Sequence, residues 1–317
     1  MSPLGPVALV VNPVAMRTTS RLRAEALRAL APHGLEWTLV TRGPGDAGRL
    51  AAQAAAEGAR VVVTVGGDGT VGEAAGALAG GSVALLPLPG GNANVFARAT
   101  GWPNDPHRAL AAAGRALAAG TLRDVRLGRL RAGGRERVFV INAGFGLDAA
   151  TVEWIETRPR LKRRLRWLGF ALGAAVVTAG AGRRAPRLSA RVDDGQAVDV
   201  LASLVACGTP YTYSGPRPLD LVPGASFDGT LAWLGLTRSR LHELTRLAAL
   251  AALGRPLPVG HAPLVGGPVP RALVVRADDA AAVQADGEPL GHHELFEVGP
   301  GPVLRIVDPR SGGPPHP

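Results

Sequence analysis

Short apolar runs alternate with longer amphipathic segments through the first 120 residues, and few folds accommodate this alternation. The runs that predict buried strands are residues 7–11, 35–41, 60–65 and 82–89. The segments that predict helices are residues 17–30, 45–58, 70–80 and 94–101. Regular alternation of this kind indicates a parallel sheet with helices on both faces. Ligands of such sheets bind outside the carboxyl ends of the strands.

After Thr121 the pattern changes to short alternating strands that are separated by turns. Residues 123–146 predict a hairpin, and a helical region follows from Asp148 to about Ala179. Further short strands continue toward the end of the chain.

These patterns predict two domains and a tail. We expect an α/β domain with a parallel sheet at residues 1–121. A mainly antiparallel, β-sandwich-like domain with a few helices is expected at residues 122–310. The remaining residues, 311–317, predict a disordered tail.

The formal net charge of +10 indicates anionic partners, such as nucleotides, nucleic acid or acidic lipid surfaces. The scattered aromatic residues provide no stacking platform, so nucleic acid is not expected as a partner. A single cysteine, Cys207, excludes an intrachain disulfide framework. The uncharged stretch at residues 167–182 is short for a membrane span.

The strand predicted at residues 60–65 runs into a bare loop, Gly66-Gly67-Asp68-Gly69-Thr70. Glycines let the backbone approach phosphates closely, and the amides that open the following helix point at the anion. Because a carboxylate repels phosphate, Asp68 indicates a cation between them, usually Mg²⁺. The alternative is a tight strand–helix turn in which Asp68 or Thr70 only caps the helix.

Two segments carry a resemblance to known kinases. Residues 66–70, GGDGT, resemble the nucleotide-binding motif shared by diacylglycerol, sphingosine, ceramide and NAD kinases. Residues 88–98, LPGGNANVFAR, resemble the P-x-G-T-x-N-D-F-A-R segment of bacterial diacylglycerol-kinase-like lipid kinases. NAD kinases carry a different second motif, so the resemblance is to the lipid kinases.

Further matches to this family follow in the same order along nearly the whole chain. They are VNP at residues 11–13, TRGPGDA at 41–47, INAGFGLDA at 141–149, PGASFDG at 223–229 and ADGE at 285–288.

Three positions depart from the family pattern. Asn92 replaces a threonine, Val95 replaces an aspartate, and Val14-Ala15 replaces Ser-Gly. A valine side chain cannot donate or accept a hydrogen bond or bind a metal, so Val95 is compatible with a family member that lacks catalytic activity.

The resemblance implies ATP as the phosphoryl donor and Mg²⁺ as its metal. The glycine loop and Gly91-Asn92 offer a phosphate cradle, and Asn12 and Thr41 follow neighbouring strands, where they can reach the ribose or base. Glu73 either accepts a hydrogen bond from the nucleotide or faces solvent. The predicted nucleotide-binding residues are Asn12, Thr41, Gly66, Gly67, Asp68, Gly69, Thr70, Glu73, Gly91, Asn92 and Asn94.

A hydroxyl substrate needs a proton acceptor, and the resemblance assigns this role to Asp286 or Glu288. Which of the two acts is left open, because Asp286 is closer to the turn and Glu288 has more reach. Taken alone, the motif is typical of a hairpin turn. The resemblance also implies metal roles for Asp124 and Asp228, although a plain β-turn is the alternative for Asp228. The predicted metal residues are Asp68, Asp124 and Asp228.

These features predict an ATP-dependent lipid kinase that phosphorylates a lipid hydroxyl. The expected substrate is diacylglycerol, which would be converted to phosphatidic acid. The alternatives are a kinase for a sphingoid base or phosphatidylglycerol, and a non-catalytic nucleotide-binding regulator. Residues 1–121 would then bind ATP, and residues 122–310 would bind the lipid.

With no visible targeting segment, we expect a cytoplasmic protein that associates peripherally with membranes. Residues 158–177 join six basic residues to an apolar helix, which favours membrane contact, and packing on the β domain is the alternative. The expected partner is the lipid substrate at the membrane surface, with a homodimer as a further option.

Overall fold

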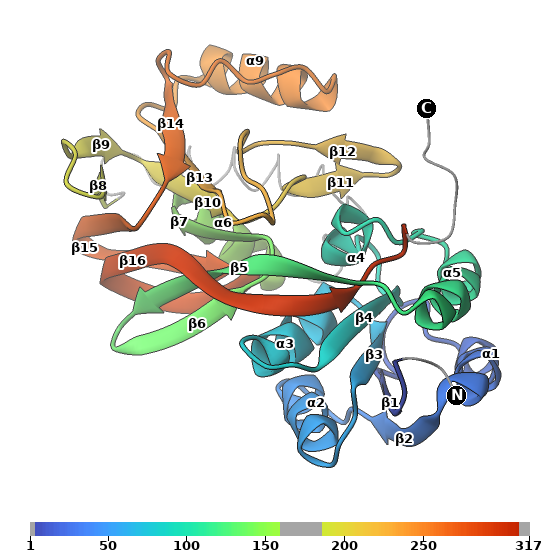
Figure 1. Ribbon diagram of the computed structural model, residues 1–317. Coiled ribbons are helices and arrows are strands. Elements are labelled where there is room, and N and C mark those ends of the chain that lie inside the picture. Colours follow the sequence, from blue (N-terminus) through green and yellow to red (C-terminus); the bar gives the residue numbers. More distant parts are fainter. Residues whose placement is uncertain (1–3, 159–185, 311–317) are drawn as a thin grey trace. The chain divides into compact units, whose positions relative to one another are not determined.

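The computed structural model describes residues 4–158 and 186–310 (Figure 1). The described residues divide into two compact units, one formed by residues 4–126 with 302–310 and the other by residues 127–158 and 186–301. It leaves the first unit within strand β5 (Leu122–Ala132) and re-enters it within strand β16 (Glu288–Val307).

The first unit is built on a parallel sheet in the order β16-β4-β3-β1-β2. Its other strands are β1 (Val7–Val11), β2 (Leu35–Val40), β3 (Val61–Gly66) and β4 (Ala84–Pro89). Every residue of β1, β3 and β4 is buried, because helices cover both faces of a parallel sheet. The predicted α/β domain is confirmed.

The helices of this unit form two pairs on opposite sides of the sheet, α1 with α5 and α2 with α3 (Figure 1). Local signals fix their ends, for example the Thr19 side chain, which accepts from the Leu22 amide at the start of α1. The helices are α1 (Ser20–Leu30), α2 (Asp46–Ala56), α3 (Asp68–Leu78), α4 (Val95–Ala99) and α5 (Pro106–Ala119), with a 3₁₀ turn at Ala31–His33.

The second unit is mainly antiparallel, with its main strand path in the order β14-β13-β10-β7-β15-β16. Strands β8 and β9 continue from β15, β6 pairs with β5, and β11 pairs with β12 in a separate sheet. The strands are β6 (Arg135–Phe139), β7 (Asn142–Gly146), β8 (Leu188–Val192), β9 (Val198–Val200), β10 (Ala202–Ala206), β11 (Thr212–Ser214), β12 (Arg217–Leu219), β13 (Leu231–Leu236), β14 (Leu264–Val269) and β15 (Leu273–Ala285). The predicted mainly antiparallel β domain is confirmed.

The described helices of the second unit are α6 (Leu147–Glu156) and α9 (Leu241–Ala252). The helix predicted from Asp148 begins at its expected place, and the remainder of that prediction lies outside the described residues. So does nearly all of the segment 158–177 for which membrane contact is predicted. Across residues 4–158 and 186–310, no helix is both long and apolar enough to cross a membrane.

The division between the units differs from the predicted boundary. The sequence places it after Thr121, whereas in the structure it follows Arg126 and residues 302–310 return to the first unit. Ile306 pairs in parallel with Leu85, so the end of β16 pairs with β4 of the first unit. Nothing in an apolar run such as PVLRIV specifies which strand it pairs with. The predicted tail, 311–317, lies outside the described residues.

Candidate nucleotide site

Two glycine pairs from neighbouring strands pack directly against each other. Gly66 ends β3 and Gly67 follows it, whereas Gly90 and Gly91 both follow β4. The Gly90 amide donates to the Gly66 carbonyl at 2.7 Å. A Cβ atom on Gly90 would lie 2.8 Å from the Gly66 nitrogen, and one on Gly91 would lie 2.5 Å from the Gly67 Cα. The bare loops are therefore required first by the contact between the two backbones.

This contact predicts different tolerances at two adjacent loop positions. A Cβ on Gly67 would meet only the Gly91 Cα at 3.5 Å, an ordinary contact, and the backbone there is extended. We expect Gly91→Ala to lower the free energy of unfolding by about 1–3 kcal/mol, as overpacking does, and Gly67→Ala to change it by less than about 1 kcal/mol. Urea denaturation measures both, and equal losses would contradict the close-approach explanation.

Asp68 connects the two glycine loops through its carboxylate. Its Oδ1 atom accepts from the amide of Val95 at 2.5 Å and from the amide of Phe96 at 3.4 Å, at the start of α4. Burial raises the pKa of the Asp68 carboxyl above its ordinary value, although these hydrogen bonds act in the opposite direction. Asp68 thus holds the GGDGT loop to the second motif. Gly69 lies exposed in the first turn of α3.

The polar residues that follow β1 and β2 lie at the carboxyl edge of the same sheet. Asn12 donates from Nδ2 to the Thr70 hydroxyl at 2.9 Å, which ties the loop after β1 to the start of α3. Thr70 and Thr41 are buried, and the Thr41 amide donates to the Val11 carbonyl at 2.9 Å. The structure therefore gathers the predicted residues Asn12, Thr41 and Thr70 where parallel sheets bind ligands.

Asn94 shapes the loop after β4. It is buried with a left-handed φ of 50°, and its side chain both accepts from the Gly91 amide (2.8 Å) and donates to the Gly91 carbonyl (3.0 Å). Its Nδ2 also donates to Asn104 at 2.9 Å. Asn92, by contrast, is exposed in this loop. The contacts of Asn94 are thus made to the protein, and nucleotide contacts by Asn92 and Asn94 stay predictions.

Glu73 contacts the start of another helix. Its two carboxylate oxygens accept from the amides of Gly45 (2.7 Å) and Ala47 (3.0 Å), and so satisfy donors at the start of α2. This arrangement positions the TRGPGDA segment from α3. The sequence did not indicate these contacts, and a nucleotide contact by Glu73 stays a prediction.

The structure distinguishes the two late carboxylates in the second unit. Asp286 and Gly287 have φ values of 51° and 81° and form the two-residue turn between β15 and β16. The Asp286 carboxylate accepts from the amides of Val140 (2.7 Å), Ile141 (2.8 Å) and Asn142 (3.1 Å). Glu288 instead forms an ion pair with Arg137, and its side chain is 44% exposed. Asp286 is therefore an anchor, and Glu288 is the more accessible candidate proton acceptor.

A buried polar cluster in the second unit was missed by the sequence analysis. Gln284 donates from Nε2 to Asp148 and to Asn142, both at 3.1 Å, and the Tyr211 hydroxyl donates to Asp148 at 3.3 Å. Burial raises the pKa of Asp148 to about 6. A Cβ on Gly144 would lie 1.8 Å from Asp148 Oδ2, so this glycine makes room for the carboxyl. The signal was present in INAGFGLDA, which contains both Asn142 and Asp148.

Residues 6–130 match the family model of the diacylglycerol kinase catalytic domain. The resemblance predicted from the two glycine motifs is thereby confirmed. The match covers the first unit up to residue 126, including the Asp68 loop and α4.

Curated bacterial relatives of the chain are described as probable lipid kinases. It is 43% identical over 111 residues to the "Probable lipid kinase YegS-like" of Pseudomonas aeruginosa strain PAO1, an alignment that covers 34% of each chain. It is 36% identical over 157 residues to the protein of that description from Xanthomonas euvesicatoria pv. vesicatoria, covering 47% of this chain and 48% of the relative. The alignments thus span a third to a half of these relatives.

The fold of the whole chain is similar to that of solved structures. A putative diacylglycerol kinase from Bacillus anthracis str. Sterne superposes with a TM-score of 0.72, at 18% identity, covering 97% of this chain and 98% of that one. A second structure described as a putative diacylglycerol kinase from the same organism gives a TM-score of 0.70 at 20% identity. At these identities the likeness shows the fold.

Within the matched segment, Val95 stands where the family pattern has an aspartate. Its backbone amide still donates to Asp68, so the loop connection does not depend on the side chain at this position. Compared with the family's aspartate, the half-buried Val95 side chain therefore lacks only a polar group at the start of α4.

Asp68 is the donor in this segment that best fits Mg²⁺. Mg²⁺ is commonly held by one or two carboxylates together with substrate phosphates, and a carboxylate in a glycine loop meets that requirement. Asp124 is paired with Arg305 at 3.0 Å in the first unit, and Asp228 accepts from the Ser226 hydroxyl at 3.1 Å in the second. In the part of the chain described here, no three His, Cys, Asp or Glu side chains cluster as a metal site. Metal binding by Asp68, Asp124 and Asp228 stays a prediction.

The raised pKa of Asp148 predicts a pH-dependent contribution to stability. In the folded state it is about 6, against an ordinary value of 3.8, so ionisation of Asp148 opposes folding. This group contributes its full stability below pH 3.8, and the contribution is lost as the pH rises through 6. The wild type loses this contribution between pH 4.5 and pH 8, and Asp148→Asn does not. The unfolding free energy of the variant minus that of the wild type should therefore rise by about 2 kcal/mol over this range. Urea denaturation at both pH values measures the gain, and parallel pH profiles would contradict it.

Proposed function

We propose that this protein is an ATP-dependent lipid kinase that converts diacylglycerol to phosphatidic acid. The observation that carries the proposal is the Asp68 carboxylate, which joins the GGDGT loop to the second lipid-kinase motif through the amides of Val95 and Phe96. This contact explains why both motifs occur in one chain, and the family match over residues 6–130 supports it. The curated relatives are described as probable lipid kinases.

The proposed reaction assigns a role to residues of each unit. The glycine loops and the start of α3 bind the phosphates of ATP, and Asp68 is the carboxylate available to the metal. Bound Mg²⁺ would neutralise charge on the phosphates. As the lipid hydroxyl oxygen bonds to the γ-phosphorus, the bond to the β,γ-bridging oxygen breaks and ADP leaves. Glu288 accepts the hydroxyl proton.

Asp286 supports this reaction by positioning Glu288. Three amide donors hold its carboxylate, which fixes the turn from which Glu288 projects. Arg137 forms an ion pair with the Glu288 carboxylate and so holds it at the end of this turn.

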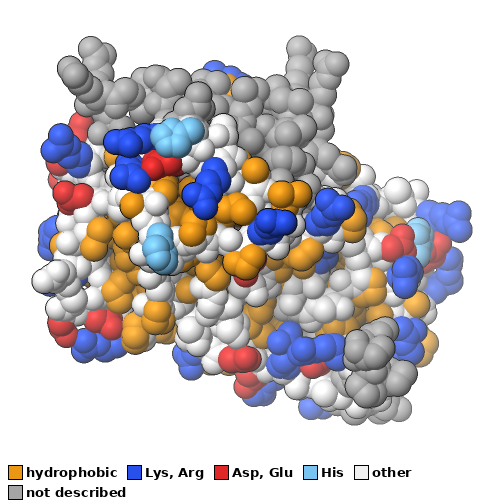
Figure 2. All heavy atoms as spheres, turned by 90° about the horizontal axis from the view of Figure 1, so that it is seen from above, with side chains coloured by type: hydrophobic (Ala, Val, Ile, Leu, Met, Phe, Trp, Pro, Cys, Tyr) orange, Lys and Arg blue, Asp and Glu red, His pale blue; other side chains and the backbone are white. Residues whose placement is uncertain are grey.

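The proposed substrate places the protein at a membrane surface, associated peripherally from the cytoplasm. Figure 2 shows a face on which arginine side chains border exposed hydrophobic side chains. Such a mixture suits contact with anionic lipid headgroups, and the net charge of +10 acts in the same direction. A homodimer stays a prediction.

The second candidate function is a nucleotide-binding regulator without catalysis, which Val95 favours. Mg-ATP consumption in detergent micelles distinguishes the two. We expect consumption that depends on lipid, with diacylglycerol more effective than a sphingoid base or phosphatidylglycerol. Mg-ATP binding without consumption on any of these lipids would favour the regulator.

A further inference from the structure

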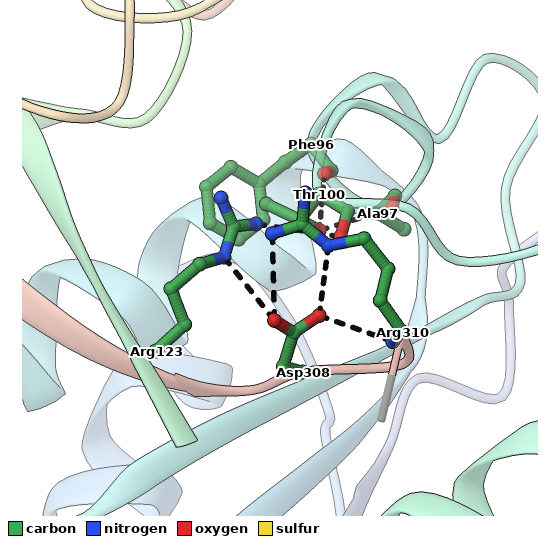
Figure 3. Close-up of polar contacts among 6 residues, drawn as sticks. All are labelled: Phe96, Ala97, Thr100, Arg123, Asp308 and Arg310. Atoms are coloured by element: carbon green, nitrogen blue, oxygen red, sulfur yellow. Dashed lines mark hydrogen bonds and ion pairs between the residues drawn. The ribbon is translucent and has the colours of Figure 1, made fainter. Parts of the chain in front are cut away.

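The chain end that returns to the first unit carries an ion cluster centred on Asp308. The Arg310 side chain donates to the Asp308 carboxylate at 3.1 Å, and Arg123 on β5 lies 3.9 Å from it (Figure 3). The Asp308 amide also donates to the Thr121 carbonyl at 3.0 Å. Burial raises the pKa of Asp308, but the hydrogen bonds from Arg310 and the charge of Arg123 outweigh this effect and lower it below its ordinary value. Asp308 is therefore a fixed anion within the first unit.

Arg123 links this anion to the carboxyl end of α4. Its guanidinium lies between Asp308 and the Thr100 carbonyl, to which it donates at 3.4 Å. The Thr100 hydroxyl in turn donates to the carbonyls of Phe96 (2.8 Å) and Ala97 (3.0 Å), which closes the helix (Figure 3).

Backbone packing brings the chain end to the same place independently. Gly101, with a φ of 100°, follows Thr100 at the end of α4, and a Cβ on it would lie 3.3 Å from the Pro309 ring. Residues 308–310 thus pack against the segment that follows α4, and the ion pair with Arg123 joins the two segments as well.

The amino end of the same short helix holds Asp68. Thr100 is connected to the start of this helix, because its amide and its hydroxyl both donate to the Phe96 carbonyl, at 2.9 Å and 2.8 Å. Any shift of Thr100 is therefore transmitted to the amides of Val95 and Phe96 and so to the Asp68 carboxylate.

We propose that Asp308 is a positioning residue of the nucleotide site, acting through Arg123 and α4 on the amides that hold Asp68. The carboxyl end of the chain would then set the geometry of a loop that lies 240 positions earlier in the sequence. The consequence for Mg-ATP rests on the proposed function, whereas the effect on α4 does not.

Amide hydrogen exchange tests the effect on α4 directly. In Asp308→Ala we expect the Val95 and Phe96 amides to exchange about tenfold faster, with amides of β1 and β3 unchanged. Asp308→Glu should restore most of the protection. The matched control is Arg305→Ala, which removes a nearby ion pair between Arg305 on β16 and Asp124 on β5. Unchanged exchange at Val95 and Phe96, or an equal increase in β1 and β3, would overturn the proposal.

Calorimetric titration with Mg-ATP tests the consequence for the nucleotide. Because misplacement of a site residue weakens its contacts, we expect the Kd of Asp308→Ala to rise about tenfold and that of Asp308→Glu to stay near the wild-type value. Faster exchange with an unchanged Kd would overturn the role in nucleotide binding. A wild-type protein that binds no Mg-ATP would overturn the proposed function, while the exchange rates would still decide whether Asp308 positions α4.

Discussion

Asp68→Asn is expected to lower kcat/KM for Mg-ATP by about 10³-fold while the protein stays folded. Under the proposed function, Asp68 is the carboxylate of the GGDGT loop that faces the metal, so its replacement removes that negative charge. Asparagine keeps an oxygen that can accept from the amides of Val95 and Phe96, which preserves the connection between the loops. Asp68→Ala would remove that acceptor as well, and its loss of activity would include a loss of stability of about 1–3 kcal/mol.

The matched control for this substitution is Asp105→Asn. Asp105 also accepts a backbone amide at a helix start, from Arg108 at the beginning of α5, but it lies outside the two glycine motifs. Steady-state kinetics should show activity close to wild type for this variant. Wild-type turnover in Asp68→Asn would remove the loop from the mechanism.

Glu288→Gln is expected to lower kcat by about 10²- to 10⁴-fold, the usual effect of losing a general base. Glutamine has the same length and keeps an acceptor for Arg137, so the affinity for ATP should change little. The measurements are the initial rate at saturating lipid and the Kd of Mg-ATP by calorimetry.

Glu294→Gln is the control for this second substitution, because Glu294 is an exposed glutamate on the same strand, β16. It should leave both quantities unchanged. If the affinity for ATP fell in step with kcat in Glu288→Gln, the residue would belong to the nucleotide site. If neither quantity changed, the motif would be only a hairpin turn.

The sequence predicted those parts of the fold that depend on local patterns. Alternating apolar runs specify buried strands and the helices between them, and the glycine loops mark where strands β3 and β4 end. The turn at Asp286 and Gly287 was equally visible, since Asp-Gly favours the left-handed conformations that a two-residue hairpin requires.

The sequence could not reveal the contacts between distant segments. Glu73 contacts the amides of Gly45 and Ala47 across two helices, and no periodicity encodes that pairing. Asp286 and Glu288 could not be told apart either, because the amides that hold Asp286 lie about 145 positions earlier.

The return of the chain to the first unit was hidden for a related reason. The pattern of residues 302–307 predicts one more strand of the β domain, because an apolar run does not specify the strand with which it pairs. Only the pairing of Ile306 with Leu85 and the ion cluster at Asp308 show where it lies.

Transfer of labelled phosphate from γ-³²P ATP to diacylglycerol in mixed micelles tests the central claim most directly. The reaction needs the wild-type protein, Mg²⁺ and lipid, and the lipid product is separated by thin-layer chromatography. We predict label in phosphatidic acid, with at most background label for Asp68→Asn. Wild-type protein that binds Mg-ATP but labels neither diacylglycerol nor another lipid alcohol would contradict the assignment as a lipid kinase.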